Sequence, residues 1–395
     1  MRKEVLFDWG ISTLYGWGVY GKNLALCAVR GTSHYAISIA PTYDKMISLS
    51  QSEEKLLAPI WQAGRDFRAL VQKVDTKSVR VPRPILHTLS ASFETVREEL
   101  YGKELIGTPS IGVTFFESTA RLSRYAASAN RRFRGIVAGS TWNANLLMTA
   151  GFDQVKLVLQ GVDTDVFFPN DRQGRFGDRF VVFSGGKLER RKGQDLVLLA
   201  FSRFARRHPD ALLVTCWNNL WPQSALDINR NMSLNPLGLA ANGELDIDKW
   251  ILANGVPENQ YFNIGFLHNT AMSEVFSEVD VAVFPNRAEG GTNLVAMEAM
   301  ASGVPVILSA NTGHLDIITD DNCYILQSQA ASAEEDELGW GESSVDEILE
   351  LLERAYVERV LSKRLGLQAA KFLRDLSWAK QIPKLLQFVD ETIAT

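Results

Sequence analysis

The feature that most constrains this chain is an alternation of short apolar runs with longer segments of helical periodicity. The apolar runs have the length of buried strands, and helical segments fill the intervals between them. The expected strands are Val5–Asp8, Tyr35–Ile39, Gly112–Phe116, Gly135–Ala138, Lys156–Leu159, Phe180–Ser184, Leu212–Cys216, Val281–Phe284 and Val304–Leu308. Buried strands separated by helices form parallel, doubly wound sheets, so the sequence predicts an α/β fold.

The 395 residues, 46% of them apolar, are enough for two hydrophobic cores. A polar segment with Pro and Gly at 167–177 predicts domains at 1–172 and 173–376. The formal charge is +5 over residues 1–172 and −10 over residues 173–395. This asymmetry predicts different partners for the two domains, and the acidic total argues against nucleic acid. A polar loop is expected at Ala330–Ser344.

The apolar runs are far shorter than the ~20 residues of a membrane span. The first residues carry charges where a signal peptide has an apolar run. Cys27, Cys216 and Cys323 are scattered and lack the spacing of metal ligands. This cysteine usage is typical of a reducing compartment without disulfides, so we expect a soluble cytoplasmic enzyme.

A glycine-rich segment, Gly16–Gly21, precedes a helix expected at Lys22–Ala28. It fits the G-x-G-x-x-G pattern, which lets phosphate oxygens approach backbone N–H groups. A dinucleotide-binding domain also needs an acidic residue at the end of its second strand, and here Asp44 comes only after Pro41. Three interpretations remain: a nicotinamide cofactor site, a tight turn, and a loop that contacts a phosphate or a sugar.

Asp163 and Asp165 form an Asp-x-Asp pattern beside the expected domain boundary. Two carboxylates at this spacing can hold a divalent ion against a diphosphate, but they also occur often in turns. We favour the structural turn, and no metal site is predicted.

A basic turn, Gly185–Gly193, follows the expected strand Phe180–Ser184. Its glycines, Gly186 among them, allow a ligand to approach the backbone closely. Lys187 and Lys192 can converge on one anion at the strand end, where open α/β sheets bind their ligands. The alternative is a solvated basic turn.

The most informative stretch follows the strand Val281–Phe284. Two glycines clear the backbone there, and the next residues can cap a helix whose free N–H groups face a diphosphate. These residues are Gly290, Gly291, Thr292, Asn293 and Leu294. Glu298 lies more than one turn into this otherwise apolar helix, where a carboxylate needs a partner such as a ribose diol. A solvent-facing Glu298 is the alternative.

Together these motifs resemble those of retaining nucleotide-sugar glycosyltransferases with the GT-B fold, in the large group called family 4. The resemblance is carried by "GWGVYGKNL" at the first helix, "GVDTDVFFP", "GKLERRKG", and the two glutamates before "AMASGVPV". It extends to Ser377-Trp378 and is most specific over residues 181–320. It implies two Rossmann-like domains that face each other across a cleft.

In such enzymes the nucleotide sugar lies in the cleft, held mainly by the C-terminal domain. The resemblance implies that Lys187, Lys192 and the helix N-terminus stabilise the diphosphate leaving group without a metal. It assigns Glu289 to the sugar hydroxyls and Glu298 to the ribose. The acceptor hydroxyl attacks on the leaving-group face, so no protein nucleophile is needed.

The remaining implied roles concern the N-terminal domain. Gly16 and Gly18 are expected to contact the β-phosphate or the sugar from across the cleft. This domain is expected to bind the acceptor, and the last helix, at 377–395, to pack back toward it.

Three positions depart from the family pattern. Eight residues separate Glu289 from Glu298, one more than the family usually has, so the loop must bulge. Lys187 replaces the usual arginine, which keeps the charge but loses the bidentate fork. Many relatives carry a histidine near Phe115–Ser118, where Glu117 is the nearest polar candidate on the acceptor side.

The expected function is sugar transfer in cell-surface polysaccharide or glycolipid biosynthesis, with a UDP-sugar as donor and no cofactor. The alternative is a catalytically weakened sugar-nucleotide-binding or scaffold protein, because of the extra residue after Glu289. A nicotinamide dehydrogenase rests on Gly16–Gly21 alone. His268 and His314 are each either a ligand contact or a structural residue.

The expected acceptor is a glycan or a lipid-linked sugar. Residues 118–135 contain five arginines and, after Ser118, no acid; they are Arg121, Arg124, Arg131, Arg132 and Arg134. This surface is either a solvated basic face or a contact with an anionic acceptor at the inner face of the membrane.

Overall fold

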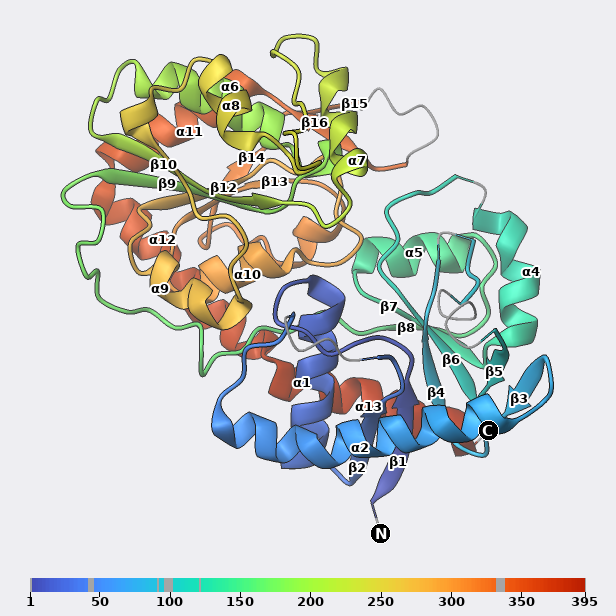
Figure 1. The fold of residues 1–395 in the computed structure, drawn as a ribbon. Coiled ribbons are helices and arrows are strands. Elements are labelled where there is room, and N and C mark those ends of the chain that lie inside the picture. The colour runs from blue at the N-terminus through green and yellow to red at the C-terminus, as the bar shows by residue number, and fades with distance from the viewer. Residues whose placement is uncertain are drawn as a thin grey trace.

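The computed structural model describes residues 2–41, 46–90, 92–95, 102–120, 122–331 and 338–394. Asp44 and Arg121 lie outside these ranges. The chain forms two α/β domains, each built on a six-stranded sheet (Figure 1). The predicted fold class, two Rossmann-like domains facing each other, is confirmed.

The N-terminal sheet has the strand order β2-β1-β4-β6-β7-β8, with all neighbours parallel. Its strands are β1 (Lys3–Phe7), β2 (His34–Ser38), β4 (Ile85–Thr88), β6 (Ser110–Thr114), β7 (Gly135–Ala138) and β8 (Val155–Leu157). The helices of this domain are α1 (Gly16–Gly31), α2 (Gln51–Lys73), α4 (Leu122–Arg132) and α5 (Thr141–Thr149). A second small sheet pairs β3 (Ser78–Arg80) with β5 (Glu104–Ile106).

The C-terminal sheet has the order β11-β10-β9-β12-β13-β14 and is also parallel. Its strands are β9 (Phe180–Lys187), β10 (Ala211–Asn218), β11 (Tyr261–Asn263), β12 (Val281–Phe284), β13 (Val306–Ser309) and β14 (Tyr324–Leu326). One core lies between the sheet and α6 (Gln194–Ala205), α8 (Ile247–Ala253) and α11 (Val345–Val357). A second core on the opposite face includes α9 (Met272–Phe276), α10 (Leu294–Ala301) and α12 (Arg359–Leu373). Burial on both faces explains why these strands read as apolar runs.

The last helix returns to the first domain. At the start of α13 (Trp378–Ala394), the backbone N–H of Trp378 donates to the carbonyl oxygen of Val162, and the N–H of Val162 donates to that of Leu376. Trp378, Ile382 and Leu385 of α13 are buried in the core formed by β1 and α1. Figure 1 accordingly shows the C-terminus beside the N-terminal sheet. The chain therefore crosses between the domains twice.

The expected Gly16–Gly21 loop is wrong, because these residues form the first part of α1. The connection from β1 instead runs over residues 8–15. A Cβ atom at Gly18 would lie 2.3 Å from the Cβ of Ser12, and one at Gly21 would lie 2.5 Å from the carbonyl oxygen of Gly10. Both glycines thus allow α1 to pack directly on this loop.

The polar loop expected at Ala330–Ser344 is also wrong at its two ends. These pair as an antiparallel hairpin of β15 (Gln329–Ala331) and β16 (Gly341–Ser343). Residues 332–337 lie outside the described part of the chain. The strand expected at Gly112–Phe116 occupies Ser110–Thr114, because the chain leaves the sheet after Thr114 and Phe116 packs in a separate core.

We predict that Gly18→Ala destabilises the protein by about 1–3 kcal/mol, because the new methyl group overlaps Ser12. Gly31→Ala, at the other end of α1, is the matched control, since its Cβ would meet nothing within 4 Å. The free energies of unfolding are measured by urea denaturation. Equal values for the two variants would contradict close packing of α1 on the loop.

Candidate active site

The carboxyl ends of both sheets face each other, and loops from the two domains touch there. Several hydrogen bonds join these loops. They include Thr13 with His268 at 2.7 Å, Ser140 with the carbonyl of Gly290 at 2.8 Å, Thr141 with Asp316 at 2.7 Å, and Gln160 with the backbone N–H of Thr292 at 3.1 Å. The basic turn and the glutamate loop lie at this junction. The candidate site is therefore built by both domains.

The basic turn is pressed against the end of β12. Arg190–Lys192 form one turn of 3₁₀ helix, and Gly193 follows with φ +70°. A Cβ at Gly193 would lie 2.2 Å from the carbonyl oxygen of Pro285. Glycine is needed here both for the left-handed conformation and for this approach. The contact places Lys192 beside the loop that carries Glu289.

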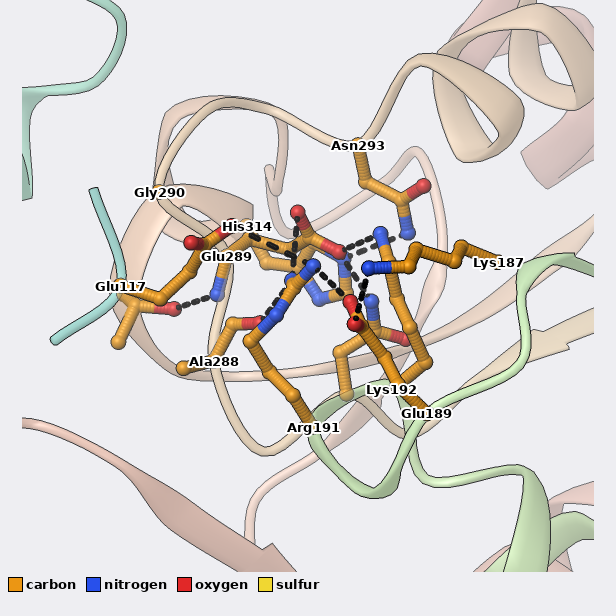
Figure 2. Close-up of polar contacts among 12 residues, drawn as sticks. Glu117, Lys187, Glu189, Arg191, Lys192, Ala288, Glu289, Gly290, Asn293 and His314 are labelled. Carbon is orange, nitrogen blue, oxygen red and sulfur yellow. Dashed lines mark hydrogen bonds and ion pairs between the residues drawn. The ribbon is translucent and has the colours of Figure 1, made fainter. Parts of the chain in front are cut away.

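The structure brings Lys192 and Glu289 together as an ion pair in which Glu289 is buried and Lys192 is partly buried (Figure 2). The carboxylate of Glu289 further accepts a hydrogen bond from Asn286 and lies 3.3 Å from Arg191. Burial alone would raise the pKa of Glu289, but the charges of Lys192 and Arg191 outweigh it and lower the pKa to about 2. Glu289 is therefore ionised and can accept hydrogen bonds from hydroxyl groups.

Arg191 is the central cation of the cluster, and sequence reasoning missed it. Its guanidinium bonds the carbonyl oxygen of Ala288 at 2.9 Å, pairs with Glu189, and lies 3.3 Å from the Oε1 of Glu117 (Figure 2). The contact with Glu117 crosses between the domains. Three neighbouring carboxylates raise the pKa of Arg191 against the effect of burial. The run of three basic residues was the signal that could have identified it.

Glu117, the acceptor-side candidate, is held at two points. Its carboxylate faces Arg191, and its backbone oxygen accepts a 3.0 Å hydrogen bond from the indole of Trp340, which precedes β16. Burial raises the pKa of Glu117, while Arg191 opposes that rise. This carboxyl group thus releases its proton less readily than Glu289 does.

Lys187 does not pair with Glu289. Its ammonium lies 3.0 Å from Glu189 and 5.3 Å from the centre of the Trp221 ring. Figure 2 shows Lys187 and Lys192 entering the same cluster from the two ends of the turn. The two lysines pair with different carboxylates, Lys187 with Glu189 and Lys192 with Glu289, so their convergence on one bound anion stays a prediction.

A buried guanidinium, that of Arg287, ties the cluster to its surroundings. Arg287 is fully buried and makes two hydrogen bonds to Asp195, at 2.8 and 2.9 Å. It also bonds both carboxylate oxygens of Glu342 in β16 and the carbonyl oxygen of Arg190. Arg287 was not among the predicted residues, because nothing in its local pattern distinguishes it from a surface arginine.

The two glycines of the loop face the N-terminal domain. A Cβ at Gly290 would lie 2.4 Å from the backbone oxygen of Phe115, and one at Gly291 would lie 2.3 Å from Oε1 of Gln160. They thus allow the domains to meet closely at this point. Gly16 approaches the same region, with its Cβ position 3.7 Å from Leu294.

Asn293 caps α10 and positions a histidine. Its Oδ1 accepts from the backbone N–H of Ala296 at 3.5 Å, and its Nδ2 lies 3.0 Å from Nε2 of His314. His314 is fully buried, and its Nδ1 lies 3.0 Å from the hydroxyl of Ser309. Burial lowers the pKa of His314 to about 4, so this imidazole is neutral at neutral pH.

Glu298 is buried, as the apolar helix around it predicts, and not solvent-facing. Its carboxyl accepts a 2.5 Å hydrogen bond from Asn269. Burial raises the pKa of Glu298 to about 8. Glu298 and Glu289 therefore carry different charges at neutral pH, although they lie on one loop and helix.

The Asp-x-Asp segment forms a turn. The backbone N–H of Asp165 donates to Oδ1 of Asp163, and the carbonyl of Asp163 accepts from Phe167. In the described part of the chain, no three His, Cys, Asp or Glu side chains gather as metal ligands would. Over the same residues, no helix combines the length and apolarity of a membrane span.

The fold and this cluster define a two-domain α/β protein with a cluster of ion pairs at the domain junction. Residues 168–338 match the family model of the glycosyl transferases group 1, in agreement with the resemblance of the motifs. The "GKLERRKG" turn and both glutamates lie within the matched residues.

Curated relatives match over the same region. A GDP-mannose-dependent alpha-(1-6)-phosphatidylinositol monomannoside mannosyltransferase of Mycolicibacterium smegmatis is 30% identical over 173 residues, 40% of this chain and 39% of that protein. A D-inositol 3-phosphate glycosyltransferase of Paenarthrobacter aurescens is 28% identical, over 48% of this chain and 44% of that protein. The matched part spans about two fifths of the length of these relatives.

Solved structures share the whole fold. A sucrose-phosphate synthase from Thermosynechococcus elongatus superposes with a TM-score of 0.67 at 14% identity, covering 100% of both chains. Anabaena HepE in complex with UDP and glucose gives a TM-score of 0.63 at 13% identity, again over 100% of both chains. These similarities show that this chain has the GT-B fold.

We predict that the Glu298→Gln variant gains stability relative to the unsubstituted protein as the pH rises from about 5 to 8. The folded protein holds the proton of Glu298 more tightly than the unfolded chain, whose carboxyl has a pKa near 4.5. The contribution of Glu298 to the free energy of unfolding is therefore complete below pH 4.5. It is lost as the pH approaches 8, by up to about 1.4 kcal/mol per pH unit. Glutamine keeps the bond from Asn269 and carries no charge.

Urea denaturation of both proteins at pH 5 and pH 8 measures this difference. Glu54→Gln, at an exposed position of α2, is the control for the loss of one carboxylate. A difference between Glu298→Gln and the unsubstituted protein that stays constant with pH would contradict a protonated Glu298.

Proposed function

We propose that this chain is a retaining glycosyltransferase that moves a sugar from a nucleoside-diphosphate sugar to an acceptor hydroxyl. The observation that carries the proposal is the Lys192–Glu289 ion pair at the domain junction, within residues that match a glycosyl transferase family model. The ionised Glu289 can bind sugar hydroxyls while Lys192 lies beside it for the diphosphate. UDP is the proposed nucleotide, since HepE, which has the same fold, is described in complex with UDP and glucose.

The proposed mechanism relies on fixed positive charge. As the bond between sugar and diphosphate breaks, negative charge grows on the leaving phosphate. Lys192, Lys187 and the N-terminus of α10 would stabilise that charge in the bound complex. The acceptor hydroxyl then attacks from the leaving-group face, and its proton passes to a phosphate oxygen. We propose that a divalent ion is not required, because these groups supply the positive charge.

The proposed acceptor side is formed by Glu117 and the N-terminal domain. Glu117 lies opposite Arg191, so an acceptor hydroxyl next to Glu117 would also be near the sugar held by Glu289. Curated relatives act on phosphatidylinositol mannoside or inositol phosphate by their names, which supports an acceptor with an anionic group. We propose a glycan or a lipid-linked acceptor in cell-surface polysaccharide or glycolipid synthesis.

We also propose a cytoplasmic reaction at the membrane surface. The described cysteines are all free thiols, which agrees with a reducing compartment. Arg124, Arg131 and Arg134 are exposed, whereas Arg132 lies 3.1 Å from Glu104. Leu122 and Phe133 between them are buried in the core, so this face offers charge without an apolar stripe.

We predict that UDP or GDP binds in the presence of EDTA, and that Lys192→Ala weakens this binding at least tenfold. A charged hydrogen bond to a phosphate contributes about 1.5–3 kcal/mol. Isothermal titration calorimetry with UDP, GDP and ADP measures the affinity, and circular dichroism checks the fold of the variant. Binding that disappears in EDTA would reject metal independence. Equal binding by Lys192→Ala would place the nucleotide elsewhere.

We predict that anionic vesicles retain the protein at low salt and that replacing Arg124, Arg131 and Arg134 by glutamine abolishes this retention. Each basic residue near an anionic bilayer contributes about 1 kcal/mol, so three give a weak and salt-sensitive attraction. Co-sedimentation with anionic and with neutral vesicles makes the comparison. Equal retention on both vesicle types would contradict the membrane contact and favour a soluble acceptor.

A further inference from the structure

The cations of the proposed donor site already have anionic partners within the protein. In Figure 2, Lys187, Arg191 and Lys192 meet Glu117, Glu189 and Glu289. An entering diphosphate thus finds positive charges that carboxylates largely compensate. At least one of these carboxylates must give up its cations for the diphosphate to bind them strongly.

Glu289 is not suited to leave the cluster. Its side chain is buried, receives a hydrogen bond from Asn286, and contacts both Lys192 and Arg191. Glu117 belongs to the other domain, and the bond from Trp340 holds its backbone. Release of either one would disturb the loop or the domain junction.

Glu189 is placed differently. Its carboxylate bridges Lys187, at 3.0 Å, and Arg191. It lies between Lys187 and Arg191, and its oxygens take positions that an anion bound to both cations would also use. Lys187 and Arg191 together lower the pKa of Glu189 against the effect of burial, so the carboxylate is ionised.

We propose that Glu189 is an internal anion that competes with the diphosphate of the nucleotide for Lys187 and Arg191. This inference rests on the proposed function of the site. In the free protein, Glu189 holds the two cations in place, which otherwise repel each other. When a diphosphate binds, Lys187 and Arg191 turn from Glu189 to the phosphate oxygens. When the nucleoside diphosphate leaves, Glu189 takes the cations back, which speeds product release.

If Glu189 competes with the diphosphate, removing its charge increases the affinity for the nucleotide instead of decreasing it. Replacing Glu189 by glutamine keeps the size of the side chain and can keep one hydrogen bond, but it removes the competing charge. If Glu189 only supported the turn, the substitution would weaken nucleotide binding. If Glu189 competes, the substitution strengthens it. Structural damage does not mimic tighter binding, so the sign alone distinguishes the two roles.

The test compares the unsubstituted protein with Glu189→Gln for UDP, GDP and inorganic pyrophosphate, by isothermal titration calorimetry with EDTA present. We expect about tenfold tighter binding and slower dissociation in stopped-flow displacement, as removal of one charge from a close pair implies. Glu353→Gln is the matched control, because Glu353 of α11 pairs with Arg207 and His208, which follow α6. The affinity of this variant for the same ligands is expected to be unchanged.

A double-mutant cycle with Lys187→Met locates the competition. In the Lys187→Met background, Glu189→Gln is expected to have a smaller effect, because one of the contested cations is gone. Unchanged, weaker or absent binding by Glu189→Gln overturns the inference. The proposed function has a different failing result: neither the unsubstituted protein nor Lys192→Ala binds a nucleotide. In that case, tighter binding of pyrophosphate by Glu189→Gln would still support the role of Glu189 as an internal anion.

Discussion

The arrangement of the site depends on one buried guanidinium. Arg287 joins the segment after the basic turn, through Asp195, to the β15–β16 hairpin, through Glu342. Its own backbone N–H donates to the carbonyl of Arg191, so the loop that leads to Glu289 is tied to the turn that carries Lys192. Removing one partner of such a pair leaves a buried charge uncompensated and costs about 3–5 kcal/mol. The relative position of Lys192 and Glu289 is therefore a consequence of this network.

The second constraint is the contact between the domains. Gly290 and Gly291 lie against the backbone and side chains of the N-terminal domain, where a larger residue would overlap Phe115 or Gln160. Arg191 and Glu117 meet across the same junction. Because α13 returns to the N-terminal core, the N-terminal domain contains segments from both ends of the chain. The groups proposed for the acceptor side and for the donor side are thus brought together only when the two domains are in contact.

Burial and pairing then give chemically similar side chains different charges. Glu289, next to Lys192 and Arg191, is strongly acidic, whereas Glu298, with an amide partner, has a pKa of about 8. His314 is kept neutral by burial. The candidate site therefore holds an ionised carboxylate at Glu289, which the proposal assigns to the sugar, and a neutral carboxyl at Glu298, where the resemblance expects the ribose. This division follows from which groups have a cation within contact distance.

The sequence by itself determined the fold class, the two domains and the segments that form the site. These are local features, which neighbouring residues in the sequence reveal without tertiary information. They are the apolar strands, the glycines at strand ends, and the pattern from Lys187 to Glu298. Only the tertiary structure decided that Gly16–Gly21 is helical, that Arg287 is buried beside the candidate site, and that Glu189 lies between Lys187 and Arg191. The physical reason is that helix starts, burial of charge and ion pairing depend on groups distant in sequence. Asp195 and Glu342, for example, bury Arg287 from 92 and 55 residues away.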